Sequence, residues 1–160
     1  MTVQDTLQAV RAHEDEFIAL RRDIHQHPEL PFEELRTSDL VAARLRDWGY
    51  HVARGLGRTG VVGQLKRGDG KRTLGLRADM DALPIQETTG LQYASRNQGV
   101  MHACGHDGHT AMLLAAAKVL AGQGDFSGTL NLIFQPAEEY GTSDCGAVRM
   151  MNDGLFDKYP

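Results

Sequence analysis

Cysteine is scarce in this chain of 160 residues, and it has neither a long apolar run nor an excess of basic side chains. The two cysteines, Cys104 and Cys145, cannot build the disulfide framework of a small secreted protein, so each thiol is expected to be buried, reactive or metal-bound. No apolar run approaches the roughly 20 residues that span a bilayer, so no membrane partner is expected. A formal net charge of -4 argues against a nucleic-acid partner, because phosphate binding requires a basic face.

The N-terminal residues are acidic and lack the apolar segment of a secretory signal, which makes the cytoplasm the expected location. The composition, 41% hydrophobic and 24% charged, is typical of a soluble globular protein, and the length suffices for one domain with a core.

Apolar spacing predicts a helix over residues 3–27, broken by Pro28, and a second helix over residues 37–48. Strands are expected at the segments 50–54, 60–66, 72–78 and 129–134. The turn at 67–70 predicts an antiparallel hairpin between the second and third of these strands, and the apolar stretch 73–76 favours a central strand.

Residues 84–101 form a long polar connection, and such connections are usually functional or mobile. A buried helix is expected over 110–121, ended by Gly122, and a last helix over 144–152. The alternation of strands and helices predicts an α/β fold with a mixed, largely parallel sheet flanked by helices.

Three polar clusters follow predicted strands or precede a predicted helix: 79–81, 101–109 and 135–139. Because sites in open α/β sheets form outside the carboxyl ends of the strands, we expect all three clusters to converge on one edge of the sheet. The cluster 101–109 contains three histidines, a thiol and a carboxylate. Imidazole and thiolate bind borderline divalent metals, so the pair Cys104 and His106 predicts a metal centre. The alternative is a polar loop whose histidines are solvated or cap the next helix.

Two adjacent carboxylates, Glu138 and Glu139, repel each other unless a cation or proton compensates them. One of them could bind metal while the other acts as a general base toward metal-activated water. The alternative is a solvated pair beside a turn. Asp81, with Asp79, could hold a histidine ligand in orientation, or the two aspartates could simply form a turn.

Four motifs resemble those of the M20 peptidases, closest to the branch of N-acyl-amino-acid amidohydrolases that includes hippurate hydrolases and auxin-conjugate hydrolases. They are the segments 21–30 (RRDIHQHPEL), 76–84 (LRADMDALP), 101–109 (MHACGHDGH) and 134–139 (FQPAEE). The resemblance runs along almost the whole chain.

This resemblance implies a centre of two divalent ions, zinc, manganese, cobalt or nickel. It implies that Cys104 bridges the ions, that His106 and Glu139 are ligands, that Glu138 is the catalytic general base and that Asp81 supports the site. The implied substrate is a small-molecule N-acyl amino acid, hippurate-like or N-acetylated, and the implied assembly is a homo-oligomer.

Members of the family are longer than this chain and supply two further histidine ligands, whereas no histidine follows His109 here. Residues 1–160 are therefore expected to be the N-terminal portion of the catalytic domain, without the smaller dimerisation domain and the C-terminal catalytic segment. Two alternatives to an amidohydrolase remain: a truncated fragment that binds metal without turnover, and a hydrolase in which Cys104 is a nucleophile.

Overall fold

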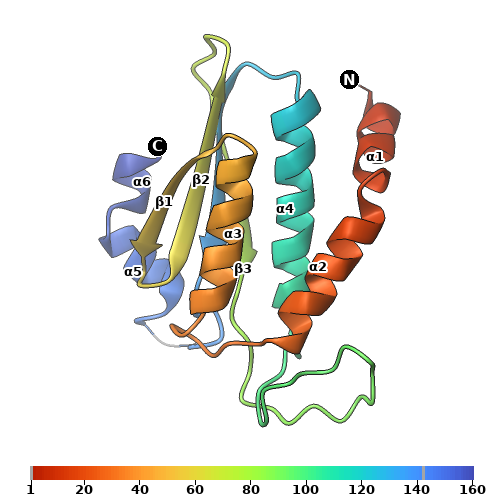
Figure 1. Cartoon of the computed structure of the whole chain (residues 1–160). Helices are drawn as coiled ribbons and strands as arrows, with labels where there is room; N and C mark the ends of the chain where they lie inside the picture. The colour runs from red at the N-terminus through yellow and green to blue at the C-terminus, as the bar shows by residue number, and fades with distance from the viewer. Residues whose placement is uncertain (1, 142) are drawn as a thin grey trace.

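The computed structural model describes residues 2–141 and 143–160. Its helices are α1 (Val3–Arg11), α2 (Glu14–Gln26), α3 (Leu35–Asp47), α4 (His106–Gln123), α5 (Gly146–Asn152) and α6 (Leu155–Lys158), and its strands are β1 (His51–Leu56), β2 (Gly60–Arg67), β3 (Thr73–Asp79) and β4 (Gly128–Gln135). Helices α2, α3 and α4 lie on one side of the sheet, and α5 and α6 lie on the other (Figure 1).

The four strands form one sheet in the order β1-β2-β4-β3. The pairs β1–β2 and β2–β4 are antiparallel, and β3–β4 is parallel. A mixed α/β sheet flanked by helices is confirmed, although one pairing of three is parallel, a smaller share than expected.

The hairpin expected between the second and third strands is wrong, because β4 lies between β2 and β3. Strand β4 buries residues on both faces, as a central strand does. Strand β3 is at the edge instead of the centre, and Leu74 on it is 58% exposed. The turn after β2 reverses the chain as expected, but turn chemistry alone does not reveal that a later strand fills the space between.

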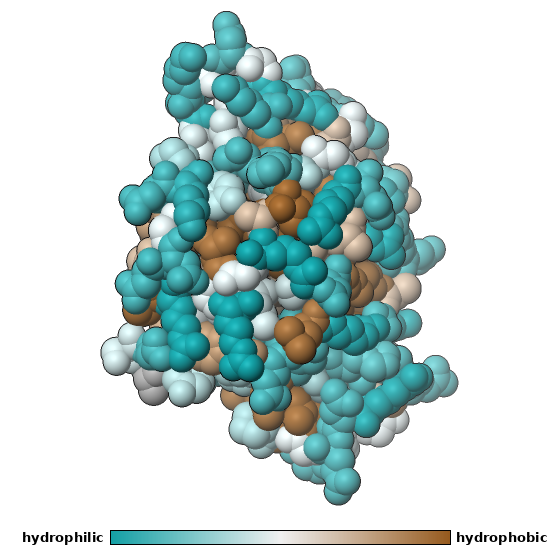
Figure 2. All heavy atoms as spheres, turned by 60° about the vertical axis from the view of Figure 1, so that its left-hand side comes forward, coloured by the Kyte–Doolittle hydropathy of each residue, from teal (hydrophilic) through white to brown (hydrophobic). Residues whose placement is uncertain are grey.

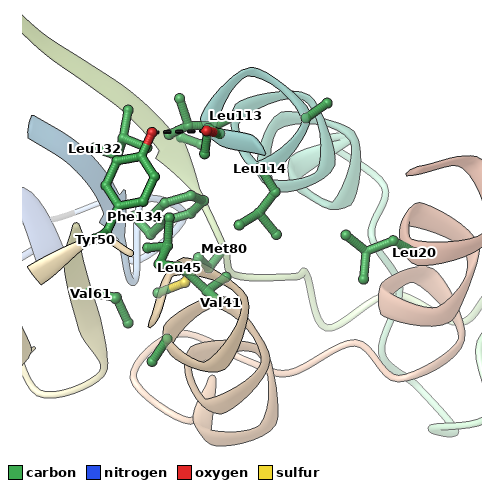
Figure 3. Close-up of a cluster of buried hydrophobic side chains, with 14 of the residues drawn as sticks. Leu20, Val41, Leu45, Tyr50, Val61, Met80, Leu113, Leu114, Leu132 and Phe134 are labelled. Atoms are coloured by element: carbon green, nitrogen blue, oxygen red, sulfur yellow. Dashed lines mark hydrogen bonds between the residues drawn. The ribbon is translucent and has the colours of Figure 1, made fainter. Parts of the chain in front are cut away.

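The main core lies between the sheet and the helices α2, α3 and α4 (Figure 3). Phe134 of β4, Leu45 of α3 and Leu114 of α4 are each fully buried there. Tyr50 reaches the same layer and donates a hydrogen bond from its hydroxyl to the main-chain oxygen of Ala117 at 3.0 Å. This layer fixes α4 against the sheet, and α4 in turn carries part of the candidate site.

Several helix boundaries differ from the sequence prediction, most clearly in the first helix and in α4. The segment 3–27 forms two helices instead of one. Ala12 is the C-cap of α1, and His13, the N-cap of α2, has non-helical backbone angles of φ -116° and ψ 11°. Helix α4 starts at His106, four residues earlier than expected, directly after Gly105 in a left-handed conformation with φ 85°. It continues through Gly122 to Gln123, so Gly122 does not end the helix as expected, and Gly124 is the C-cap residue. His106 and His109 therefore lie on the first turn of a helix rather than in a loop.

A second, smaller core of Leu56, Val62, Met150 and Leu155 joins the far face of the sheet to α5 and α6. Figure 2, turned toward that side of the molecule, shows hydrophobic atoms in small patches among hydrophilic side chains. Within the described residues, no helix is both long and apolar enough to cross a membrane.

Candidate metal centre

Three polar segments meet where β3 and β4 end and α4 begins. The two strands are parallel and Asp79 pairs in register with Gln135, so the residues that follow both strands emerge at one edge of the sheet. The amide of Met80 donates to the oxygen of Gln135 at 3.0 Å, and the hydroxyl of Thr110 donates to the oxygen of Asp79 at 2.8 Å. These bonds bring the start of α4 to the same edge, and the expected convergence of the three clusters is found.

His106 is buried and has two distinct sides. Its Nδ1 lies 3.0 Å from the main-chain oxygen of Asp81 and 3.2 Å from Oδ1 of the same residue. Both neighbours are acceptors, which assigns the proton to Nδ1. The other nitrogen, Nε2, lies 3.8 Å from a carboxylate oxygen of Glu138 and 3.8 Å from one of Glu139. The ring is thus held by one nitrogen, and its free lone pair points toward acidic side chains.

Cys104, His106 and Glu139 bring one sulfur, one nitrogen and one oxygen within 4.8 Å of one another. Oε1 of Glu139 is buried and, among the described residues, has no hydrogen-bond partner. An acceptor without a partner is costly to bury, and a cation between these three atoms would satisfy it. The donor set of thiolate, imidazole and carboxylate fits a borderline divalent metal.

The same cluster is rich in negative charge. The pKa of the Cys104 thiol is raised to about 11, first by its interaction with the Glu139 carboxylate, then by burial and by the charges of Glu139, Glu138 and Asp79. Within residues 2–141 and 143–160, no lysine or arginine lies within ion-pair distance of Glu138 or Glu139. A bound cation would compensate this charge and release the thiol proton.

A second group of possible ligands, Asp79, His106 and His109, overlaps the first. Nδ1 of His109 lies 3.6 Å from Asp79, and Arg77 forms an ion pair with the same aspartate. Both groups need Nε2 of His106, which lies 3.9 Å from Asp79. One lone pair cannot serve two ions, and Asp79 already has a cationic partner, so the group with Cys104 is the better metal site.

Asp81 is fully buried and connects the ligand-bearing segments. One carboxylate oxygen contacts His106, and the other accepts a hydrogen bond from the amide of Glu139 at 2.8 Å. Burial raises the pKa of this carboxyl, but the hydrogen bonds from His106 and from the amides of Glu139 and Glu138 outweigh it, and the net shift is downward. The Asp81 side chain is thus placed to orient His106 and the backbone of Glu139.

His102, the remaining histidine of the run 101–109, belongs to neither group of possible ligands. It is buried beside His25, with ring centroids 6.3 Å apart, and burial lowers its pKa to about 4. Counting histidines in the sequence could not separate this buried ring from the ligand candidates.

The sequence also gave no role to a second polar cluster, formed by Arg21, His25, Glu87 and Asp107, which we call the α2 cluster. Nδ1 of His25 lies 2.7 Å from Asp107 and Nε2 lies 3.3 Å from Glu87, while Nε of Arg21 lies 2.7 Å from Asp107. Arg21 and His25 lie in the motif at 21–30, which the sequence analysis used only as part of the family resemblance. The contact of His25 with Glu87 could not be predicted from that motif, because Glu87 lies in the long connection 84–101.

Comparison with known proteins identifies the family and agrees with the fold. The family model described as Peptidase family M20/M25/M40 matches residues 75–160, more than half of the chain. This chain belongs to that family.

Among its relatives, a hippurate hydrolase of Campylobacter jejuni is 58% identical over 144 residues, which cover 90% of this chain and 37% of the relative. An N-acyl-L-amino acid amidohydrolase of Geobacillus stearothermophilus is 42% identical over 158 residues, covering 98% of this chain and 42% of the relative. Among solved structures, the YXEP protein of Bacillus subtilis, a dinuclear metal binding peptidase from the M20 family, superposes with a TM-score of 0.84 at 38% identity, covering 92% of this chain and 41% of that one. The chain therefore spans about two fifths of the length of these proteins.

Proposed function

We propose that this chain supplies part of the metal centre of an amidohydrolase that cleaves the amide bond of N-acyl amino acids, hippurate-like or N-acetylated. The observation that carries the proposal is the meeting of Cys104, His106 and Glu139 around the unpartnered, buried oxygen of Glu139. The names of the relatives, a hippurate hydrolase and an N-acyl amino acid amidohydrolase, support the substrate class.

Two divalent ions are proposed for the intact site, with Cys104 between them and His106 and Glu139 as ligands on this chain. The dinuclear relative supports the count, and the donor set is compatible with zinc, manganese, cobalt or nickel. Ions bound here would polarise the amide carbonyl and lower the pKa of water.

Glu138 is the proposed general base. Its side chain is 43% exposed, so it reaches solvent while one carboxylate oxygen stays 3.8 Å from Nε2 of His106. In this position it accepts a proton from the attacking water and returns it to the leaving amine. Asp81 contributes by holding His106 and the amide of Glu139 in place.

The remaining ligands are proposed to come from outside residues 1–160, as two further histidines, together with a smaller domain that completes the substrate site. One imidazole, one thiolate and one carboxylate are too few for two ions. The intact enzyme, with all of its metal ligands, is proposed to be a cytoplasmic homo-oligomer.

A second candidate is metal binding without turnover, which the small number of ligands on this chain favours. A nucleophilic role for Cys104 is disfavoured, because a thiol with a pKa of about 11 remains protonated near neutral pH and so is a poor nucleophile.

The test compares the protein as its gene encodes it with a Glu138→Gln variant, after loading with manganese, cobalt or zinc. In the Glu138→Gln variant, kcat for hydrolysis of hippurate and of N-acetyl amino acids is expected to be about 10²–10⁴-fold lower than in the unaltered protein, which is the usual contribution of a general base. Bound metal should stay unchanged in the variant, and Glu33→Gln, at an exposed residue, serves as the matched control. Metal binding by the unaltered protein with no hydrolysis above background would select the second candidate.

A further inference from the structure

A buried carboxylate outside the metal centre supports the segment that carries Glu138 and Glu139. Glu34, at the start of α3, is 0% exposed. Its Oε1 accepts a hydrogen bond from the amide of Ala137 at 2.8 Å, and its Oε2 accepts one from the hydroxyl of Thr59 at 2.5 Å. A residue distant in sequence thus binds the backbone directly before the proposed base.

The backbone of this segment needs outside support. Ala137 has φ 48°, a left-handed conformation that is unfavourable for a residue with a Cβ. The oxygen of Ala137 accepts a hydrogen bond from the amide of Gly146 at 3.1 Å, and a side chain at Gly146 would come within 1.7 Å of the oxygen of Pro136. The turn is therefore held from both sides, by Glu34 on one and by the close approach of α5 on the other.

Glu138 lies between two amides that are each bound by a buried carboxylate. The amide before it, on Ala137, is bound by Glu34, and the amide after it, on Glu139, is bound by Asp81 at 2.8 Å. The bond to Glu34 fixes the peptide unit between Pro136 and Ala137, and the bond to Asp81 fixes the one between Glu138 and Glu139. Holding the turn at these two points restricts the backbone of Glu138 and helps to direct the side chains of Glu138 and Glu139 toward Nε2 of His106. Asp81 contacts His106 itself, whereas the Glu34 side chain accepts hydrogen bonds from Thr59 and Ala137, outside the set of candidate ligands.

Retaining a carboxylate at this depth is costly. Burial raises the pKa of Glu34, and hydrogen bonds from Thr59 and from the amides of Glu34, Ala137 and Phe32 offset part of that shift. If Glu34 contributed only packing, an apolar side chain of similar volume would give the same or higher stability. Its contribution therefore lies in its hydrogen bonds.

We propose that Glu34 is a positioning residue that fixes the turn at Ala137 and so aims Glu138 and Glu139 at the metal centre. This inference rests on the proposed function, since it gives Glu34 an effect on metal affinity and turnover rather than on folding alone.

Two substitutions at Glu34 separate positioning from packing. Glu34→Gln keeps an oxygen for the amide of Ala137 and an amide that can donate to the hydroxyl of Thr59, whereas Glu34→Leu has a similar volume and no acceptor. Glu33→Gln, at the exposed neighbour, is the control. Thr59→Val removes one donor with little change in shape, and it keeps the test open if Glu34→Leu fails to fold.

The readouts are affinity for cobalt, measured by competition with a chelator, and kcat and KM on hippurate, each on protein shown to be folded by circular dichroism. Glu34→Leu is expected to lose about 10–100-fold in metal affinity and in kcat with little change in KM, the range typical of residues that orient ligands. Glu34→Gln should recover most of both, and Thr59→Val should lie between them.

If Glu34→Leu, or Thr59→Val in its place, lowers the melting temperature but matches the control in metal affinity and kcat, Glu34 is structural and the inference is overturned. If the unaltered protein itself binds no metal, the proposed function fails first, and the two failures are thereby distinguished.

Discussion

Two polar clusters flank the start of α4, and they differ in how their charge is balanced. In the α2 cluster, the carboxylates of Asp107 and Glu87 face Arg21 and both ring nitrogens of His25. In the metal centre, Glu138 and Glu139 share one imidazole nitrogen with a thiol. The adjacent residues His106 and Asp107 belong to different clusters.

The difference separates a structural network from a ligand site. Each cluster contains a buried carboxylate oxygen without a hydrogen-bond partner, Oδ1 of Asp107 in the α2 cluster and Oε1 of Glu139 in the candidate metal centre. In the α2 cluster the other oxygen of Asp107 faces Arg21 and His25, whereas no lysine or arginine of the described residues pairs with Glu138 or Glu139. An excess of acceptors without a cationic side chain is the state expected of metal ligands. Substitutions in the two clusters should therefore affect different quantities.

The largest effect is expected from Glu139→Gln in the metal centre. Loss of a charged ligand should weaken metal binding by about 100-fold or more, because ligand substitutions cost at least as much as changes in the residues that orient them. Without metal the same change should leave the melting temperature unchanged or slightly higher, since it removes a negative charge from a cluster where acidic side chains are in excess. Chelator competition and thermal unfolding in a metal-free buffer measure the two quantities. A clear drop in stability without metal would show that Glu139 has a partner in the protein.

Asp107→Asn, in the α2 cluster, should show the reverse pattern. It removes a fully buried charge that pairs with His25 and Arg21, so unfolding without metal should become easier by about 3 kcal/mol, at the low end for a buried pair because Arg21 is one third exposed. Denaturant unfolding at neutral pH measures this change. Loss of metal affinity exceeding that of Glu139→Gln would erase the distinction between the clusters.

The smallest effect is a pH dependence of metal affinity. The pKa of Cys104 near 11 means that the thiol carries its proton at neutral pH, and a metal must displace that proton to bind sulfur. Affinity should therefore rise with pH, by about tenfold per unit for one displaced proton, up to the thiol pKa. The slope is measured by chelator competition across pH, and Cys104→Ser should reduce it. An unchanged slope in that variant would remove sulfur from the ligand set.

The local chemistry of the site could be predicted from the sequence, because it depends on residue types close together in the chain. Cys104, His106 and Glu139 were expected to meet, and they do, since parallel β3 and β4 end at the same edge. The roles of these residues, of Glu138 and of Asp81 remain predictions.

The long-range arrangement could not be predicted in the same way. The position of β4 between β2 and β3 depends on which strand buries both faces, and a turn at 67–70 does not encode it. The contacts of His25 with Glu87 and of Glu34 with Ala137 join residues 62 and 103 positions apart. A single sequence offers no pairing signal at such separations, so the contacts of Glu34 and of the α2 cluster were missed.

The most direct test of the account is the absorption spectrum of the cobalt-loaded protein. Sulfur bound to cobalt gives a charge-transfer band in the near ultraviolet, so the unaltered protein should show that band. Cys104→Ser should abolish it, while Cys145→Ser should leave it intact. A spectrum without the band in the unaltered protein, or one that persists in Cys104→Ser, would contradict a metal centre built on Cys104, His106 and Glu139.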